Sequence, residues 1–246
     1  MTGRTRFGEM TRMTTLLLST RNGHKEQEIR SILGNEFDYL TLNDFPGAPH
    51  VVEDADSFAG NATRKAVQLA EWLVRGHPSP PRPRGRRAAC ILADDSGLEV
   101  DALKGAPGVH SARFAAIDSE GSQNSPDAAN TEKLLHLLAN VPAGKRGARF
   151  RCVIAVTPVP LTVSRNSSPV CYANELELQT ELFTGTCEGR IDFHPRGQDG
   201  FGYDPLFIPD GYDVSFAELG EGVKNRLSHR GKALAKARQH LLAVGR

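Results

Sequence analysis

The stretch Ala93-Asp94-Asp95-Ser96-Gly97-Leu98-Glu99-Val100-Asp101 follows the apolar run AACIL at 88–92, which is typical of a buried β-strand. Two adjacent carboxylates beside such a strand are costly unless each meets solvent or a cation. Because side chains alternate along a strand, Asp94 and Asp95 point in opposite directions. One can face a cleft while the other braces a turn, which the following Ser-Gly pair favours. The pattern indicates a site for a hard cation such as Mg²⁺, and so phosphate chemistry, although an ordinary solvated turn has the same sequence.

Size and charge exclude several classes of protein. The 246 residues suffice for one large domain or two small ones. The 30 basic and 29 acidic residues give a net charge of +1, which argues against a nucleic-acid coat or a membrane-surface binder. The four cysteines form no CxxC pair, which favours a reducing compartment over a disulfide framework or metal knuckle. Because no apolar run approaches the ~20 residues of a bilayer span, we expect a cytoplasmic protein without membrane or nucleic-acid partners.

Alternating strand and helix patterns predict an α/β fold with a mixed sheet, in a single domain over residues 13–246. The polar residues 1–12 are expected to form a disordered extension. The Pro/Arg-rich segment 76–87 and the segment 157–169 are predicted loops. Strands are expected at 14–20, 37–42, 88–92, 149–156 and 174–183, and helices at 24–33, 58–74, 126–140, 215–218 and 228–244.

Two polar segments are candidates for binding phosphate. The run STRNGHK at 19–25 joins a strand to a helix, where backbone N–H groups and a lysine one turn later suit an anion. It lacks the Walker A spacing, and an ordinary helix N-cap is the alternative. Asn61 and Lys65 lie four residues apart on one helix face, which presents an amide and an ammonium to phosphate or simply to solvent. Acids just upstream, among them Glu53, can complete a metal site with Asp95.

Two segments near the C-terminus suit a planar ligand. In GFGYDP at 200–205, glycines around two aromatic residues let a ring lie at an open site, and aromatic faces stack on nucleobases. An aromatic-anchored loop is the plainer interpretation. In the following segment, Lys224, His229 and Arg230 lie at the start of the last helix, where the macrodipole disfavours cations. Their placement suggests that they bind a ligand.

In this order, the motifs closely resemble those of the inosine/xanthosine triphosphate pyrophosphatase family. The resemblance covers nearly everything from Thr14 onward, and only the combination of motifs makes it specific. His110 stands where the family usually has tyrosine, and segments 76–87 and 158–173 resemble insertions. The matching motifs are TRNGHK at 20–25, SFAGNA at 57–62 with Lys65, ADDSGL at 93–98, PGVHSAR at 107–113, GFGYDP at 200–205 and SHR at 228–230.

The resemblance implies an elongated central sheet with flanking helices, two lobes around a central cleft, and a homodimer. It also implies Mg²⁺-dependent hydrolysis of ITP, dITP and XTP to the monophosphate and pyrophosphate. Glu53 and Asp95 would hold Mg²⁺, and Asp95 would also orient or deprotonate the attacking water. Lys65, the second implied catalytic residue, would neutralise the triphosphate together with Lys25 and the 20–25 loop. The implied substrate-binding residues are Thr20, Arg21, Asn22, Gly23, His24, Lys25, Ser96, Phe201, Gly202, Tyr203, Asp204, Lys224, His229 and Arg230.

Two other functions stay open from the sequence. A related pyrophosphatase of the septum-inhibitor type would act on pyrimidine triphosphates, but we expect it to lack the SHR segment at 228–230. A non-enzymatic nucleotide- or RNA-binding protein would use the arginines of 82–87 as its contact. The near-zero net charge and the Asp94–Asp95 pair argue against polyanion binding without a metal.

Replacing residues 76–87 by a short Gly/Ser link is expected to leave enzymatic activity nearly unchanged. The segment has no apolar periodicity, and loop length has only a weak effect on the free energy of folding. Steady-state kinetics of the shortened protein test this. A large rise in KM would show instead that the arginines of this segment reach the substrate.

Overall fold

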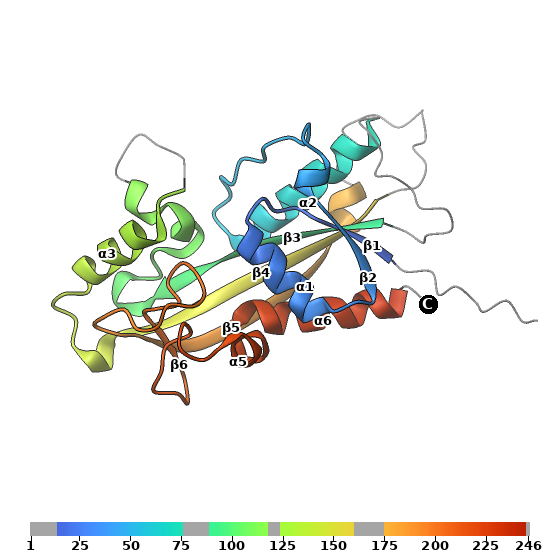
Figure 1. Ribbon diagram of the computed structural model, residues 1–246. Coiled ribbons are helices and arrows are strands. Elements are labelled where there is room, and N and C mark those ends of the chain that lie inside the picture. The colour runs from blue at the N-terminus through green and yellow to red at the C-terminus, as the bar shows by residue number, and fades with distance from the viewer. Residues whose placement is uncertain (1–13, 76–88, 118–123, 160–174, 245–246) are drawn as a thin grey trace, which may run out of the picture.

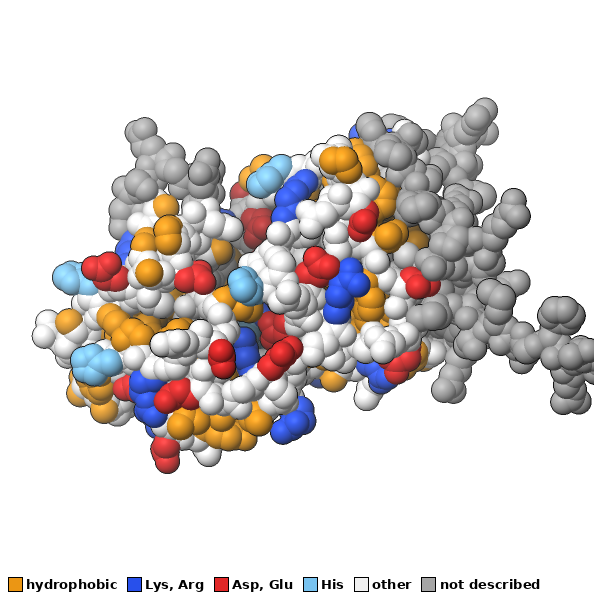
Figure 2. Space-filling model, viewed as in Figure 1, with side chains coloured by type: hydrophobic (Ala, Val, Ile, Leu, Met, Phe, Trp, Pro, Cys, Tyr) orange, Lys and Arg blue, Asp and Glu red, His pale blue; other side chains and the backbone are white. Residues whose placement is uncertain are grey.

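The computed structural model describes residues 14–75, 89–117, 124–159 and 175–244. The expected extension 1–12, the loop 76–87 and most of the expected insertion 158–173 lie outside these ranges. Within the described ranges, none of the helices combines the length and apolar character that a bilayer span requires. On the face shown in Figure 2, basic and acidic side chains are interspersed rather than gathered into one basic patch.

Six strands form one mixed sheet in the order β2-β1-β3-β4-β5-β6 (Figure 1). The strands are β1 (Thr14–Leu18), β2 (Phe37–Thr41), β3 (Ala89–Val100), β4 (Gly147–Val159), β5 (Glu181–Ile191) and β6 (Phe207–Pro209). β1 runs parallel to both β2 and β3, whereas β3, β4, β5 and β6 pair antiparallel. The predicted α/β class with a mixed sheet is therefore confirmed.

Helices cover both faces of the sheet (Figure 1). The helices are α1 (Gly23–Leu33), α2 (Phe58–Val74), α3 (Asp127–Leu137), α5 (Glu221–Leu227) and α6 (His229–Val244), and a 3₁₀ segment, η3, spans Gly108–Ala116. α2 packs on β3 and β4 from one side, and α6 packs on β4 and β5 from the other, with α1 beside it. Consecutive strand residues serve opposite cores, as when Ile91 faces the α2 layer and Leu92 the α6 layer. Burial on both faces explains the near-continuous apolar runs of the central strands.

The prediction of a turn after Asp95 is wrong, because β3 continues through Ser96 and Gly97. β3 pairs with β4 without interruption from Ala89↔Val159 to Val100↔Ala148. Gly97 has a different purpose here: a Cβ at this position would collide with the Gly108 carbonyl oxygen and lie 3.0 Å from a ring carbon of Phe58. The glycine therefore lets η3 pack directly on the strand.

Three further element predictions need correction. Residues 157–159, expected in a loop, belong to β4, and residues 175–178, expected in a strand, form a helical turn before β5 begins at Glu181. The capping pattern at 215–218 closes a turn instead of a helix, because Ser215 N donates to Glu218 Oε2 at 2.8 Å. The short helix α5 was not expected at all.

Gly185→Ala is expected to destabilise the protein by about 1–3 kcal/mol, because a Cβ there would collide with the His229 carbonyl oxygen and lie 2.7 Å from Ala233 N, both in α6. Urea unfolding measures the change. Gly144→Ala is the matched control, since no atom lies within 4 Å of its Cβ position, and a shift within about 0.5 kcal/mol is expected there. Equal effects of the two variants would contradict the tight β5–α6 contact.

Candidate active site

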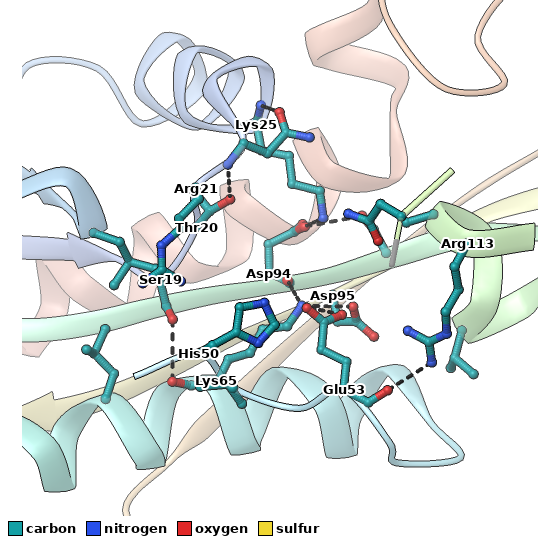
Figure 3. Close-up of a pocket in the computed structure, with 18 of the residues that line it drawn as sticks. Ser19, Thr20, Arg21, Lys25, His50, Glu53, Lys65, Asp94, Asp95 and Arg113 are labelled. Atoms are coloured by element: carbon teal, nitrogen blue, oxygen red, sulfur yellow. Dashed lines mark hydrogen bonds and ion pairs between the residues drawn. The ribbon is translucent and has the colours of Figure 1, made fainter. Parts of the chain in front are cut away.

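A hollow of about 460 Å³ opens beside the middle of β3 (Figure 3). Its walls come from the β1–α1 loop, the segment before α2, α2 itself, β3 and η3. Each of these elements contributes a charged residue to its lining. The polar and charged residues that line it are Ser19, Thr20, Arg21, Asn22, Lys25, His50, Glu53, Lys65, Asp94, Asp95, Ser96, Arg113 and Asn124.

Asp95 lies on the α2 side of the sheet, held by two side chains of that helix. Lys65 Nζ lies 3.1 Å from Asp95 Oδ1 and 3.0 Å from Glu53 Oε2, so one ammonium bridges two carboxylates. Asn61 Nδ2 donates to Asp95 Oδ2 at 3.2 Å. The interpretation of Asn61 as a phosphate ligand is therefore wrong, since its amide positions the carboxylate.

Burial and charge shift the acid–base behaviour of this group. Burial raises the pKa of the Asp95 carboxyl, although Lys65 and Lys25 act in the opposite direction. Burial lowers the pKa of the Lys65 ammonium, but Asp95 and Glu53 outweigh it, so the pKa lies above the ordinary value. Lys65 therefore stays protonated, and Asp95 binds a proton more readily than an exposed aspartate does.

The pair Glu53 and Asp95 has donors that suit Mg²⁺. Mg²⁺ is commonly held by one or two carboxylates together with waters and substrate phosphates. Both carboxylates approach the same point, the Lys65 ammonium, at 3.0–3.1 Å. Across residues 14–75, 89–117, 124–159 and 175–244, no three His, Cys, Asp or Glu side chains group into an all-protein cage. A metal held by these two carboxylates would need waters or substrate oxygens to complete its coordination.

Asp94 points to the other side of the sheet, as the alternation of strand side chains requires. Arg230 Nε donates to Asp94 Oδ2 at 3.0 Å, and Lys25 Nζ is ion-paired with Oδ1. The Cys152 Sγ lies 3.1 Å from Oδ2. Burial alone would raise the pKa of Asp94, but Arg230 and Lys25 hold it well below its usual range. The two adjacent carboxylates therefore have separate cation partners.

Arg230 extends this network to α1. Its Nη1 lies 2.6 Å from Glu28 Oε2, and its Nη2 donates to Ser96 Oγ at 2.7 Å. The guanidinium is 2 % exposed, and the neighbouring carboxylates keep it charged. Glu28 was missed in the sequence, although its spacing of three from Lys25 placed both on one face of the helix.

The β1–α1 loop is built as a helix cap. Asn22 Oδ1 accepts from the backbone N–H groups of His24 at 2.9 Å and Lys25 at 3.2 Å, and Thr20 Oγ1 accepts from Asn22 N at 3.1 Å. These N–H groups, expected to hold an anion, are occupied by the cap, which was the plainer alternative. Arg21 Nη2 donates to Ala48 O at 3.0 Å. The loop and the first turn of α1 thus contribute side chains to the hollow, among them that of Lys25.

A second hollow of about 150 Å³ adjoins the first and shares five wall residues with it, Asn22, Lys25, Ser96, Ala112 and Asn124. Its other polar and aromatic walls are Ser111, Ser125, Asp127, Asn130, Phe150, Phe201, Tyr203, Asp204, Lys224, His229 and Arg230. The structure thus brings together most of the residues expected to bind substrate from four separate parts of the sequence.

Phe201 forms an aromatic wall of the smaller hollow. Its ring is stacked against His24 with centroids 5.7 Å apart, and Lys224 Nζ lies 4.9 Å from the ring centroid. Asp204 Oδ2 accepts from Phe201 N at 2.9 Å and from Lys224 Nζ at 2.7 Å. Lys224 therefore has a carboxylate partner within the protein, as Arg230 does, and the macrodipole argument does not explain their placement.

His229 differs from these two cations. Its ring stacks on Phe150 at 4.7 Å with an interplanar angle of 10°, and its Nδ1 is buried without a hydrogen-bond partner. Burial, followed by the charge of Arg230, lowers the pKa of His229 well below its ordinary value, so the imidazole is neutral. His229 lies in the wall of the smaller hollow, and a buried ring nitrogen without a partner is unusual.

Arg113 is a further wall residue that the sequence indicated only as the end of a turn. Its Nη2 donates to the Glu53 carbonyl oxygen at 2.9 Å, which fixes the irregular segment that carries Glu53 (Figure 3). The signal for it was weak, because an arginine after a Gly-Pro turn is usually exposed.

Asp94→Asn is expected to lower the free energy of unfolding by about 3–5 kcal/mol at pH 7, since it leaves Arg230 without a neutralising partner on this side. Because the folded-state pKa of Asp94 is depressed, its contribution is present above the unfolded pKa of ~3.9 and is lost as the pH falls through the folded value. The gap between wild type and variant should therefore shrink below about pH 4.

Urea unfolding at several pH values measures that gap. Asp213→Asn is the control, because its ion pair with Arg190 at 3.4 Å is exposed and should contribute little at any pH. A pH-independent gap would contradict the charged network around Asp94.

Comparison with known proteins finds relatives over nearly the whole chain. The model of the Ham1 family matches residues 16–240. A dITP/XTP pyrophosphatase of Desulforamulus reducens is 43% identical over 227 residues, 92% of this chain and 94% of that protein. One of Opitutus terrae is 40% identical, over 90% and 95% of the two chains. The structure of a HAM1 protein from Coxiella burnetii is 32% identical, covers 94% of this chain and 100% of its own, and superposes with a TM-score of 0.70. This chain belongs to the Ham1 family.

Proposed function

We propose that this protein hydrolyses the non-standard purine nucleoside triphosphates ITP, dITP and XTP to the monophosphate and pyrophosphate. The observation that carries the proposal is the pair of adjoining hollows, one lined by cations and carboxylates and the other walled by Phe201. A polyphosphate fits the first, and a planar base fits the second. The names of the relatives as dITP/XTP pyrophosphatases support this assignment.

The larger hollow supplies charge for the triphosphate. Lys25, Lys65 and Arg113 all line it, and the first two already contact the carboxylates at its floor. Preorganised cations stabilise the charge that develops on a phosphoryl group during transfer. Glu53 and Asp95 would hold Mg²⁺, which supplies further charge at the phosphate oxygens when bound.

Asp95 is the residue we assign to the attacking water. Its pKa is raised by burial, which favours accepting a proton, and Asn61 and Lys65 fix both of its oxygens. A carboxylate held in this way can orient the water and receive its proton during attack on the phosphorus. Ser96 and the 20–25 loop would position the triphosphate beside it.

The smaller hollow is assigned to the purine base, with Phe201 as its stacking surface. Hypoxanthine and xanthine carry a carbonyl at position 6, where adenine carries an amine. Lys224 and Arg230 can only donate, so they suit that carbonyl and leave an adenine amine unpaired. The unpartnered Nδ1 of His229 supplies a further contact. Tyr203 and Asp204 form part of the wall. Because the donors of the site would be left unpaired against the adenine amine, ATP is disfavoured.

Two expectations extend the proposal. The family resemblance suggests a homodimer built around a two-lobed subunit, and a nucleotide-pool enzyme is expected in the cytoplasm. Light scattering of the purified protein tests the dimer.

Incubation with Mg²⁺ and a panel of nucleotides tests the reaction directly. ITP, dITP and XTP are expected to give the monophosphate and pyrophosphate, with ATP, GTP and the pyrimidine triphosphates turned over far more slowly. Release of orthophosphate with IDP from ITP, or a preference for pyrimidines, would overturn the proposal.

Asp95→Asn is expected to lower kcat on the order of 10²–10⁴-fold or more, because an amide is a poor Mg²⁺ ligand and cannot accept the proton of water. Asp101→Asn makes the same chemical change one residue beyond β3 and should leave kcat near the wild-type value. Retention of more than about a tenth of wild-type activity in Asp95→Asn would move the catalytic role to another carboxylate, and a melting curve shows whether the variant is folded.

A further inference from the structure

The loop that carries Phe201 has no regular secondary structure, so other groups must determine its shape. Its backbone turns at Gly200 and Gly202, whose φ angles are 79° and 61°. Glycine adopts such angles readily, but it also leaves the chain free to adopt many others. Phe201 therefore depends on contacts from outside the loop to keep its ring at the wall of the smaller hollow.

One such contact comes from Asp127, the first residue of α3. Its Oδ2 accepts a hydrogen bond from the backbone N–H of Gly202 at 2.7 Å, across 75 residues of sequence. An acidic residue in the first turn of a helix normally stabilises the N–H groups of its own helix. Here the carboxylate also binds an N–H next to Phe201, and both Asp127 and Gly202 lie in the wall of the smaller hollow.

The helix that carries Asp127 is itself fixed to the site. Asn130, one turn later, is 2 % exposed, and its Oδ1 accepts from Ala115 N in η3 at 2.8 Å. Lys133 Nζ donates to Phe114 O at 2.8 Å in the same segment. These bonds tie the first two turns of α3 to η3, so Asp127 is presented from a rigid support.

A second tie holds the other side of Phe201. The Tyr203 hydroxyl donates to the Ser111 carbonyl oxygen of η3 at 2.9 Å. Phe201 thus lies between two anchored neighbours, Gly202 through α3 and Tyr203 through η3, in addition to the Asp204 bond to its own N–H. Among the residues that hold Phe201 and its neighbours, Asp127 is exposed, and its carboxylate lies outside the ion-paired core.

We propose that Asp127 is a positioning residue for base recognition, acting through the Gly202 N–H to hold Phe201 in its stacking position. The inference rests on the proposed function and adds to it a residue that the family resemblance did not indicate. Asp127 touches neither the triphosphate end nor Asp95, so it should affect base binding and leave the chemical step alone.

Two substitutions separate the hydrogen bond from the charge. Asp127→Ala removes the acceptor, whereas Asp127→Asn keeps a carbonyl oxygen that can accept from Gly202 N–H. Thr131→Ala is the matched control on α3, since among the described residues the Thr131 hydroxyl bonds to backbone carbonyls of its own helix, Asp127 O and Ala128 O. Asp127 is exposed and Thr131 is half-buried, and neither is part of the core, so all three variants should fold, which thermal melts check.

The measurements are the Kd of IMP and of inorganic pyrophosphate by calorimetry, and kcat and KM for ITP. Asp127→Ala is expected to weaken IMP binding and raise the KM for ITP on the order of tenfold, the usual effect of losing a hydrogen bond to a charged group. The kcat and the Kd of pyrophosphate should stay within about twofold of wild type. Asp127→Asn should restore most of the affinity for IMP.

The results separate this inference from the proposed function. Equal Kd values for IMP in Asp127→Ala and wild type would overturn it, as would an Asp127→Asn variant as weak as Asp127→Ala, or an equal loss in Thr131→Ala. A wild-type protein that binds IMP but does not convert ITP to IMP and pyrophosphate would refute the proposed function, while the IMP affinities still decide the role of Asp127. A wild type that does not bind IMP would overturn both.

Discussion

The arrangement of the helices around the sheet depends on two adjacent buried carboxylates, Asp94 and Asp95. Asp94 and Asp95 are consecutive residues of a strand that is covered on both faces, so they are buried on opposite sides of the sheet, with residue exposures of 4 % and 5 %. Buried carboxylates destabilise a fold unless cations and hydrogen-bond donors reach them. Each face of the sheet must therefore carry a helix with a cation at a fixed position.

The helices meet this requirement from opposite sides. α2 places Lys65 and Asn61 on Asp95, and α1 and α6 place Lys25 and Arg230 on Asp94. The registration of three helices against one strand is thus fixed by ion pairs as well as by apolar packing. The same registration brings the ligand-facing groups of all three helices to one edge of β3, so the interactions that satisfy the buried charges also assemble the proposed site.

Sequence patterns predicted the mixed sheet and most helices, because periodicity is a local signal. Most of the candidate site residues that the ordered motifs indicated line the two hollows. Sequence patterns failed where the deciding contact lies far away in the chain. The run around Asp95 has good turn chemistry, yet pairing with β4 along twelve residues overrides it. Likewise, nothing near Arg230 indicates that Glu28, about two hundred residues earlier, binds its guanidinium. The role of Asp127 toward Gly202, 75 residues away, also depends on geometry that spacing alone does not reveal.

The shared wall of the two hollows has a consequence for turnover. A ligand that occupies both is held at two ends, and its second contact forms at the high effective concentration that the first contact creates. Hydrolysis between the two ends divides this bivalent ligand into two monovalent fragments. Each fragment then keeps only its own contacts, and the advantage of joint attachment disappears with the bond that is broken. Under the proposed function, the joined hollows would therefore hold the whole substrate more tightly than either of its parts.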